Sequence, residues 1–100
     1  MNKNVIDISS EKLEKSTEIL RALAHPIRLA VVELLSTNKA MSVTEIYTAL
    51  SIEQAVASHH LRILKDRGVV SLSREGSNSF YSLKNSIFTQ ILELMYKLTA

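Results

Sequence analysis

The stretch from Ile52 to Arg67 repeats its apolar positions with the period of an α-helix. At about 100° per residue, one face carries the mainly apolar set Val56, Ala57, His60, Leu61, Ile63 and Leu64. The opposite face carries Gln54, Ala55, Ser58, His59, Arg62 and Lys65. This second face holds amide, hydroxyl, imidazole and cationic groups, and no carboxylate before Asp66. A helix that enters the major groove of DNA needs short polar side chains flanked by cations, so the pattern predicts a DNA-recognition helix.

Two helices are predicted at the start of the chain. Ser10 and the acids after it precede an apolar stripe that ends near Ala24, which predicts a first helix behind a loose arm at residues 1–9. Pro26 interrupts this pattern, because proline disfavours helix in the preceding residue and fits the first turn of a new helix. A second helix is therefore expected from Pro26 to about Ser36. Apolar residues lie on nearly every side of this helix, which indicates a central, buried position.

A shorter helix is expected directly before the recognition helix. We expect Thr44 to cap it, because a threonine hydroxyl can accept a backbone amide of the first turn, and we expect it to end at Leu50. Residues 41–43 have room for no more than a minimal strand. Two helices joined by a tight turn, with the polar side chains on the second, form a helix-turn-helix.

A β-hairpin and a final helix are predicted after the recognition helix. Gly68 is expected to end that helix in the left-handed conformation. Residues 69–83 contain two alternating runs around a glycine-containing loop at residues 75–78, which is the pattern of a hairpin. The last helix, from about Ser86 to Leu98, has a wide apolar face. The sequence therefore predicts a mainly α fold with a small β-hairpin, a winged helix-turn-helix in the order α-α-β-α-α-β-β-α.

The composition fits one small domain that spans residues 1–100. Apolar residues make up 46% of the chain and charged residues 22%, which is enough to bury a core. The absence of cysteine excludes disulfides and thiolate metal sites. The N-terminus does not resemble a signal peptide, and no run approaches the about 20 apolar residues needed to cross a bilayer. We therefore expect a cytoplasmic protein with no membrane partner and no cofactor, associated with the nucleoid when bound to DNA.

The charge is small in total but unevenly distributed. The formal net charge is +2. Residues 1–53 carry six Lys and Arg against seven Asp and Glu, a net charge of −1, whereas residues 54–100 carry six against three, a net charge of +3. The basic residues therefore concentrate on and after the predicted recognition helix, as expected for a DNA-binding surface.

The candidate DNA contacts lie in three parts of the chain. On the recognition helix they are Gln54, Ala55, Ser58, His59, Arg62 and Lys65. Thr44 would contact a phosphate at the start of the preceding helix, and Arg74 and Ser77 would contact the backbone or minor groove from the hairpin. Each residue alone fits an ordinary solvated surface, but their combination favours DNA contact. The sequence contains no recognisable constellation of catalytic residues, so no enzymatic activity is predicted.

Four stretches of the chain resemble the ArsR/SmtB family of small dimeric bacterial repressors. They read LRALAHPIRLAVVELL, SVTEIYTAL, QAVASHHLRILKDRGVV and REGSNSFYSL, and together they run from Leu20 to Leu83. The resemblance implies a winged-helix dimer built on the first and last helices, with a ligand or metal that lowers the affinity for DNA. It also implies a basic residue at the position of Ser77.

The residues at the metal-binding positions of that family differ in this chain. Ser42 and Thr44 stand where family members often carry paired cysteines, and Asn85 and Ile87 stand where a second site uses Asp and His. We therefore expect no metal site of either kind. At the recognition helix, Glu53 and Ala55 replace a serine pair that is common in the family. The main base contacts are consequently expected in the middle of the helix.

The three histidines are interpreted as structural or DNA-contacting residues. His60 lies on the apolar side and is expected to hydrogen-bond to a neighbouring helix, and His25 is expected at a helix boundary. His59 and His60 are adjacent and point about 100° apart, so they cannot chelate one metal ion from one helix. A metal site formed across a dimer by unrecognised ligands remains an alternative.

A homodimer is expected because one small domain can hardly cover the apolar stripes of both terminal helices. The residues expected at the interface are Leu13, Ile19, Leu20, Ile87, Ile91, Leu94, Met95 and Leu98. A two-fold dimer would place two recognition helices about 34 Å apart, one turn of DNA, and would bind a palindromic operator in double-stranded DNA. The predicted function is a dimeric transcriptional repressor with an unknown effector. The alternatives are a metal-responsive repressor with an unrecognised site and a winged-helix module that binds protein.

Overall fold

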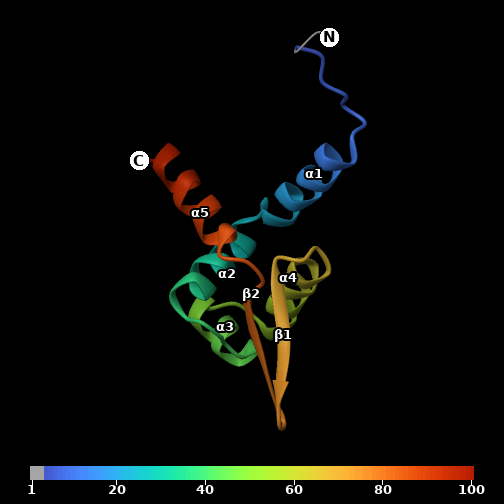
Figure 1. Ribbon diagram of the computed structural model, residues 1–100. Helices are drawn as coiled ribbons and strands as arrows, with labels where there is room; N and C mark the ends of the chain where they lie inside the picture. The colour runs from blue at the N-terminus through green and yellow to red at the C-terminus, as the bar shows by residue number, and fades with distance from the viewer. Residues whose placement is uncertain (1–3) are drawn as a thin grey trace.

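The computed structural model describes residues 4–100, which form five helices and one two-stranded sheet (Figure 1). The elements are α1 (Glu11–Leu23), α2 (Pro26–Thr37), α3 (Val43–Leu50), α4 (Gln54–Asp66), β1 (Val70–Glu75), β2 (Asn78–Leu83) and α5 (Ile87–Leu98). The expected minimal strand at 41–43 is a single bridge between Met41 and Tyr81. This order confirms the predicted winged helix-turn-helix. Residues 1–3 of the expected N-terminal arm lie outside the described residues.

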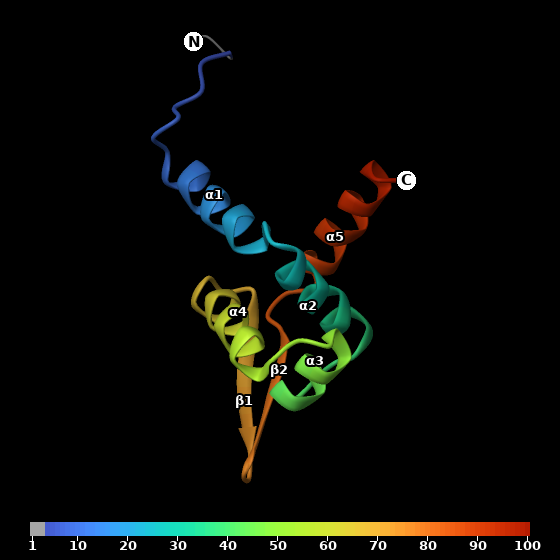
Figure 2. The same cartoon turned by 180° about the vertical axis from the view of Figure 1, so that it is seen from behind.

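Helix α2 lies at the centre of the fold and contacts α1, α3, α4, α5 and β2. Helices α3 and α4 and the hairpin form the body below it, and the hairpin tip projects at one end (Figures 1 and 2). Helices α1 and α5 diverge from the opposite end like the arms of a V. Within residues 4–100, no helix is long and apolar enough to span a membrane.

The core joins residues of every helix and of β1. Its buried members are Ala22, Leu23, Val31, Val32, Leu35, Met41, Ile46, Leu61, Leu64, Val69, Val70, Phe88 and Leu92. Ile46, Leu61 and Leu64 are completely buried, and each such side chain stabilises the fold by about 1.5–3 kcal/mol. Because Leu61 and Leu64 belong to α4, the core fixes this helix on one side and leaves its other side to solvent.

The predicted helix starts at Ser10 and Pro26 are confirmed. The Ser10 hydroxyl accepts a hydrogen bond from the Leu13 amide at 3.2 Å. Pro26 occupies the first position of α2, where its missing amide hydrogen costs nothing, and the His25 ring Nδ1 accepts from the Ile27 amide at 3.1 Å. His25 is therefore a helix-capping residue, as its position before the proline indicates.

The prediction that Thr44 caps α3 is wrong, because Ser42 occupies that position. The Ser42 hydroxyl accepts a hydrogen bond from the Glu45 amide at 3.2 Å. The Glu45 carboxylate accepts a hydrogen bond from the Ser42 amide at 2.9 Å. This reciprocal capping box satisfies two donors at once, whereas a cap at Thr44 would satisfy one. Thr44 consequently lies within the first turn of α3, and its side chain is exposed.

The hairpin is confirmed with a tighter loop than its sequence indicates. The strands pair antiparallel from Val70 opposite Leu83 to Glu75 opposite Asn78, so only Gly76 and Ser77 form the turn. Gly76 has φ 64°, whereas Ser77 does not have a positive φ, which agrees with a type II′ turn. This short turn places Ser77 at the extreme tip of the wing.

Candidate nucleic-acid interface

The turn between α3 and α4 is held by backbone hydrogen bonds. The Ser51 amide donates to the Thr48 carbonyl at 3.2 Å, and the Ile52 amide donates to the Tyr47 carbonyl at 3.1 Å. Ser51 adopts the left-handed conformation with φ 54°, which glycine usually supplies, at a cost of about 1–2 kcal/mol. The turn therefore places α4 at a defined angle to α3 even though it contains no glycine.

Helix α4 has the two predicted faces. Ala57, His60, Leu61 and Leu64 are buried against the rest of the fold. The candidate DNA contacts on the other side are all exposed: Gln54, Ala55, Ser58, His59, Arg62 and Lys65. The sequence pattern thus separates the side chains that hold the helix from those that can reach a ligand.

Val56 departs from the predicted pattern. Helical periodicity places it on the core side, but 36% of its side chain is exposed. It lies at the edge of the buried arc and in the first turn of α4, where fewer neighbours cover the helix. Next to Ala55, it adds to the exposed apolar surface in the first turn of α4.

The cations of the exposed face are not neutralised within the described chain. Arg62 and Lys65 form no ion pair with any of residues 4–100, and neither does Arg74 on the hairpin. Arg67, in contrast, pairs with Glu18 of α1 at 3.3 Å. Arg62 and Lys65 are therefore available for phosphate or base contacts, whereas Arg67 ties the end of α4 to α1.

Thr44, Arg74 and Ser77 are exposed and lie on the elements that flank α4. Thr44 is in the first turn of α3, where the amides of Val43 and Thr44 have no helical acceptor and can bind a phosphate. Arg74 lies next to the tip of the hairpin and pairs with Ser79 across the strands. The structure therefore places each predicted contact residue at the surface of a helix-turn-helix or its wing.

His60 anchors α4 to α2. It is only 7% exposed, and its Nδ1 lies 3.3 Å from Nη1 of Arg28, as predicted for a packed histidine bonded to a neighbouring helix. Its ring centroid lies 4.3 Å from that of His25. Burial lowers the pKa of His60 from its usual 6.5, and the nearby His25, Arg28 and His59 lower it further. The lowered pKa favours the neutral form of His60, whose ring packs α4 against α2.

The hydrogen bonds of His25 and His60 define the tautomer of each neutral ring. The Nδ1 atoms of His25 and His60 both accept hydrogen bonds, so the remaining ring nitrogen of each carries the proton. Among residues 4–100, no group of three or more His, Cys, Asp or Glu side chains is arranged to hold a metal ion. Asn85 lies two residues before the first residue of α5, and its side-chain oxygen accepts a hydrogen bond from the Ile87 amide at 2.8 Å.

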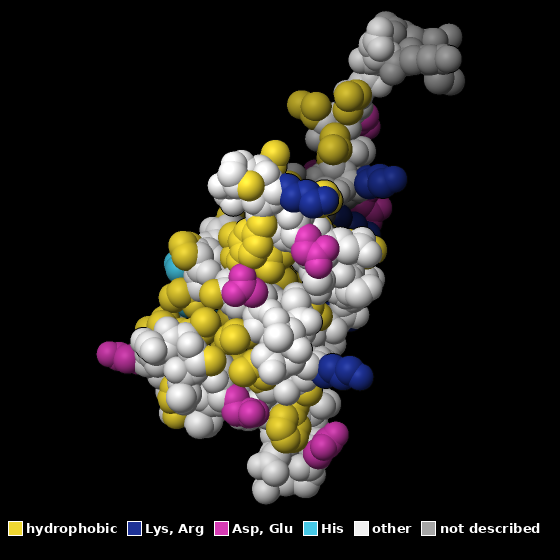
Figure 3. All heavy atoms as spheres, turned by 90° about the vertical axis from the view of Figure 1, so that its left-hand side faces the viewer, with side chains coloured by type: hydrophobic (Ala, Val, Ile, Leu, Met, Phe, Trp, Pro, Cys, Tyr) yellow, Lys and Arg dark blue, Asp and Glu magenta, His cyan; other side chains and the backbone are white. Residues whose placement is uncertain are grey.

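Apolar side chains are exposed on both arms of the V. On α1 and α5 they include Leu13, Leu20, Ile87, Leu94, Met95 and Leu98, with Leu94 60% and Leu98 81% exposed. Ile19 and Ile91, also predicted at a dimer interface, are half-buried. Figure 3, viewed from the side of α5, shows apolar side chains grouped between sparse charges.

An apolar hollow lies between the two arms. It has a volume of about 220 Å³ and is lined by Leu20, Leu23, Ala24, Leu29, Ile91 and Met95. Helix α5 is held on α2 by hydrogen bonds from Tyr96 to Glu33 and between Ser36 and Thr89. These bonds attach both the first and the last turn of α5 to α2.

Comparison with known proteins identifies the helix-turn-helix region. Residues 23–72 match the protein family described as a helix-turn-helix domain. An HTH-type transcriptional regulator of Methanocaldococcus jannaschii is 39% identical over 88 residues, which cover 88% of this chain and 99% of that protein. The transcriptional repressor PagR of Bacillus anthracis is 35% identical over 83 residues, which cover 83% of each protein.

The solved structures extend the similarity to the whole fold. The crystal structure of PagR matches with a TM-score of 0.77 at 34% identity, covering 84% of this chain and 95% of that one. A homodimeric winged helix-turn-helix DNA-binding domain from Mycobacterium bovis, described as a possible ArsR-family transcriptional regulator, matches with a TM-score of 0.82 at 26% identity. This second match covers 98% of the chain and 90% of the Mycobacterium bovis domain.

Proposed function

Because this chain belongs to the ArsR/SmtB-type winged-helix transcriptional regulators, which bind DNA, we propose that it is a homodimeric repressor of a palindromic operator. In this proposal α4 enters the major groove of each half-site. The wing follows the adjacent backbone or minor groove, and the first turn of α3 binds a phosphate.

The outer face of α4 is the observation that carries this proposal. It presents Ser58, His59 and Arg62 in the middle of the helix, with Lys65 one turn further on, and all four are exposed. Ser58 and His59 can hydrogen-bond to base edges, and Arg62 can bind guanine with two hydrogen bonds or bind a phosphate. Gln54 can bind adenine, and Ala55 can contact a thymine methyl group. The carboxylate of Glu53, directly before the helix, repels phosphate and leaves these central residues as the main contacts.

The wing and α3 contribute contacts that do not depend on base sequence. Arg74 adds a cation beside the hairpin tip, and Ser77 adds a hydroxyl at the tip itself. Thr44 and the free amides of the first turn of α3 offer hydrogen bonds to one phosphate. Such contacts set the position and affinity of the protein on the duplex, whereas α4 supplies sequence preference.

Dimerisation through α1 and α5 is supported by the exposed apolar side chains on both helices and by the homodimeric Mycobacterium bovis domain. A two-fold dimer pairs two identical surfaces and brings two α4 helices to the same side of the DNA. Their spacing of about one DNA turn, 34 Å, predicts a palindromic operator with half-sites about 10 base pairs apart. A protein with this role acts in the cytoplasm, on nucleoid DNA.

Neither alternative function is favoured by a specific observation. A protein-interaction module would carry a neutral or apolar outer face on α4, but this face carries Arg62 and Lys65 without acidic partners in the described chain. A metal-responsive repressor would need ligands that the arrangement of His25 and His60 does not supply.

The proposal is tested by selecting operator fragments from genomic DNA with the purified protein and sequencing them. The expected result is an inverted repeat with half-sites about one helical turn apart, protected from cleavage by the bound protein. Fragments without two-fold symmetry, or no enrichment above bulk DNA, would contradict the proposal. A reporter gene placed behind the selected site should be expressed less when the protein is present.

A further inference from the structure

Arg28 links three helices of the fold. It belongs to α2, where its side chain is half-buried. Its Nη1 lies 3.3 Å from Nδ1 of His60 in α4, and its Nη2 donates to the carbonyl oxygen of Arg21 in α1 at 3.3 Å. Within residues 4–100 it forms no ion pair. The guanidinium therefore joins the recognition helix to a helix that carries part of the proposed dimer interface.

The bonds of Arg28 define direction better than they provide stability. Its Nε is buried and has no hydrogen-bond partner among the described residues, which lowers the stability of the fold. An apolar pair of similar size often stabilises a fold as well as a buried polar pair does. An apolar pair lacks direction, however, whereas a planar guanidinium donates along fixed lines. The bonds to His60 and to the Arg21 carbonyl therefore define how α4 is oriented relative to α1 and α2.

We propose that Arg28 is a positioning residue for sequence recognition: its bonds to His60 and to the Arg21 carbonyl hold α4 in the orientation that base contacts with the operator require. Hydrogen bonds from Ser58 and Arg62 to base edges depend on the orientation of the helix. Phosphate contacts depend on it less, because charge attraction is not directional. Loss of the link therefore lowers affinity for the operator more than affinity for unrelated DNA. This inference rests on the proposed function, since it concerns α4 as the helix that contacts the bases.

Protonation of His60 breaks the same link. Its Nδ1 accepts a hydrogen bond from Arg28 only while it carries no proton of its own. The charged and titratable groups that face it are His25 and Arg28 of the α2 start and His59 of α4, and α1 contributes the uncharged Arg21 carbonyl to this cluster. Burial and these three basic groups lower the pKa of His60 from 6.5. Preference for the operator should therefore be complete above that pH and should be lost as the pH falls below it.

The role of Arg28 is tested by measuring the affinities of Arg28→Gln and Arg21→Gln proteins for the operator and for unrelated DNA, by fluorescence anisotropy. Arg28→Gln should lose about fivefold or more in operator affinity and should bind unrelated DNA as the wild-type protein does. Arg21→Gln removes the same charge but keeps the backbone carbonyl, so both affinities should be unchanged. A purely structural role would lower both affinities of Arg28→Gln by one factor, the folded fraction that circular dichroism measures.

A pH series tests the link without altering Arg28. His60→Asn keeps an acceptor at the same distance along the side chain as Nδ1 and cannot be protonated. In the wild-type protein, the ratio of operator affinity to unrelated-DNA affinity should fall by about twofold or more between about pH 7.5 and about pH 5.5, and in His60→Asn it should stay constant. Both proteins keep His25 and His59, so the difference between them reports His60 alone.

Two results would overturn the inference while leaving the proposed function intact. One is an equal effect of Arg28→Gln on both DNAs, or an equal loss in Arg28→Gln and Arg21→Gln. The other is the same pH dependence of the affinity ratio in the wild-type and His60→Asn proteins. A wild-type protein that selects no operator at about pH 7.5 would contradict the proposed function itself, and the inference with it.

Discussion

At the scale of single residues, His60 is held by neighbours that all disfavour its charged form. The ring packs beside that of His25 and accepts a hydrogen bond from Arg28. It lies edge-on to the ring of His59, and the centroids of these two rings are 5.2 Å apart. Burial and these neighbours lower its pKa. Protonation of His60 therefore lowers the free energy of unfolding.

The pH dependence of folding follows from this lowered pKa. A base whose pKa is lower in the folded protein binds protons more readily when unfolded, so acid favours the unfolded state. The free energy of unfolding, measured by urea denaturation, should be constant above about pH 7.5 and should fall as the pH drops below 6.5, the usual pKa of histidine. A His60→Asn variant should be less stable at neutral pH but should lose less on acidification. Stability that rises between pH 7 and pH 5 would contradict this account.

The cap of α3 offers a second test at the same scale. Ser42→Ala removes one half of the capping box and should lower the free energy of unfolding by about 1 kcal/mol. Thr44→Ala, two residues further on and exposed, should change it by less than about 0.5 kcal/mol. Urea denaturation of the two variants measures both values. A larger loss in the Thr44 variant would mean that Thr44 is the cap after all.

Sequence reasoning at this scale succeeds where a residue type strongly prefers one backbone conformation. Pro26 and Gly68 mark the start of α2 and the end of α4 because their backbone requirements are local. The prediction of Thr44 as the cap overlooks Ser42, because the spacing Ser-x-x-Glu identifies a cap only when both partners are considered together. Periodicity does not predict the 36% exposure of Val56, because exposure at the edge of the buried face depends on how far neighbouring elements extend.

At the scale of elements, some residues of the helix-turn-helix and the wing hold these elements in the fold, and others are exposed for contact with DNA. The buried side of α4 packs against the core, while α3 is fixed by its capping box and by the turn at Ser51. The hairpin is joined to the body through the pairing of Met41 with Tyr81. The tip with Arg74 and Ser77 therefore extends from a base that is joined to the body of the fold.

Removal of the wing cation should weaken DNA binding without changing sequence preference. Arg74→Ala is expected to lower operator affinity, and to lower affinity for unrelated DNA by the same factor, because a phosphate contact does not depend on the base. The slope of log affinity against log salt should fall by about 1. Fluorescence anisotropy over a salt series measures both quantities, with Lys97→Ala on α5 as a control that should bind normally. A loss confined to the operator would show that Arg74 contacts bases instead.

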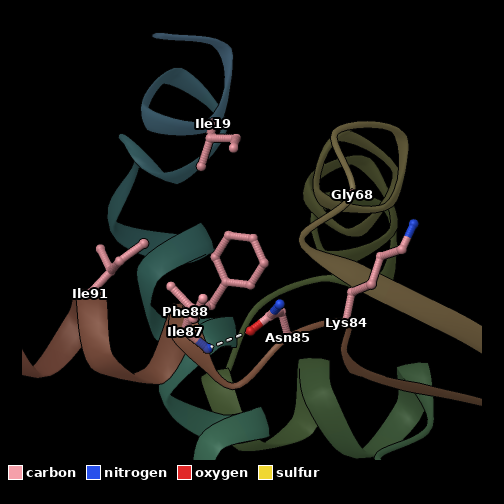
Figure 4. Close-up of a pocket in the computed structure, with 7 residues that line it drawn as sticks. All are labelled: Ile19, Gly68, Lys84, Asn85, Ile87, Phe88 and Ile91. Atoms are coloured by element: carbon pink, nitrogen blue, oxygen red, sulfur yellow. Dashed lines mark hydrogen bonds between the residues drawn. The ribbon is translucent and has the colours of Figure 1, made fainter. Parts of the chain in front are cut away.

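The element order could be predicted almost completely from sequence because each element carries its own periodicity and its own start or stop residue. The sequence predicts a longer hairpin loop, since residues 75–78 separate the two alternating runs. Pairing of Glu75 with Asn78 shortens it to Gly76 and Ser77, because cross-strand register is set by tertiary contacts as well as by local preference. The hollow that Figure 4 shows, lined by Ile19, Gly68 and residues between 84 and 91, could not be predicted, since its walls come from three separate parts of the chain.

At the scale of the whole molecule, two arms rise from one end of the body and leave apolar side chains in solvent. Leu94 and Met95 on α5 and Leu20 on α1 are all exposed, and the hollow between the arms is apolar throughout its lining. The sequence predicts more apolar residues on α1 and α5 than one subunit can cover. The exposed residues confirm this prediction for the single chain. The geometry of the dimer could not be predicted in the same way, because it depends on the angle at which α1 and α5 diverge.

Dimerisation through these arms is tested by placing a charge on α5. Leu94→Asp should cost the single subunit little stability, because the side chain is already 60% exposed, but it should disrupt an apolar interface between subunits. Sedimentation at micromolar concentration should give about twice the chain mass of 11.2 kDa for the wild-type protein and the chain mass for the variant. Lys97→Asp, which changes charge on the same helix, should remain a dimer. A dimeric Leu94→Asp protein would place the interface elsewhere.

The central claim is that the exposed face of α4 binds DNA, and the salt dependence of binding by Arg62→Ala and Lys65→Ala proteins tests it most directly. Operator affinity should fall in both variants. The slope of log affinity against log salt should decrease by about 1 for each phosphate that the variant no longer neutralises. An unchanged slope with a loss of about 1–3 kcal/mol at one operator base pair would identify Arg62 as a residue that binds a base. Wild-type affinity and salt slope in both variants would contradict the claim.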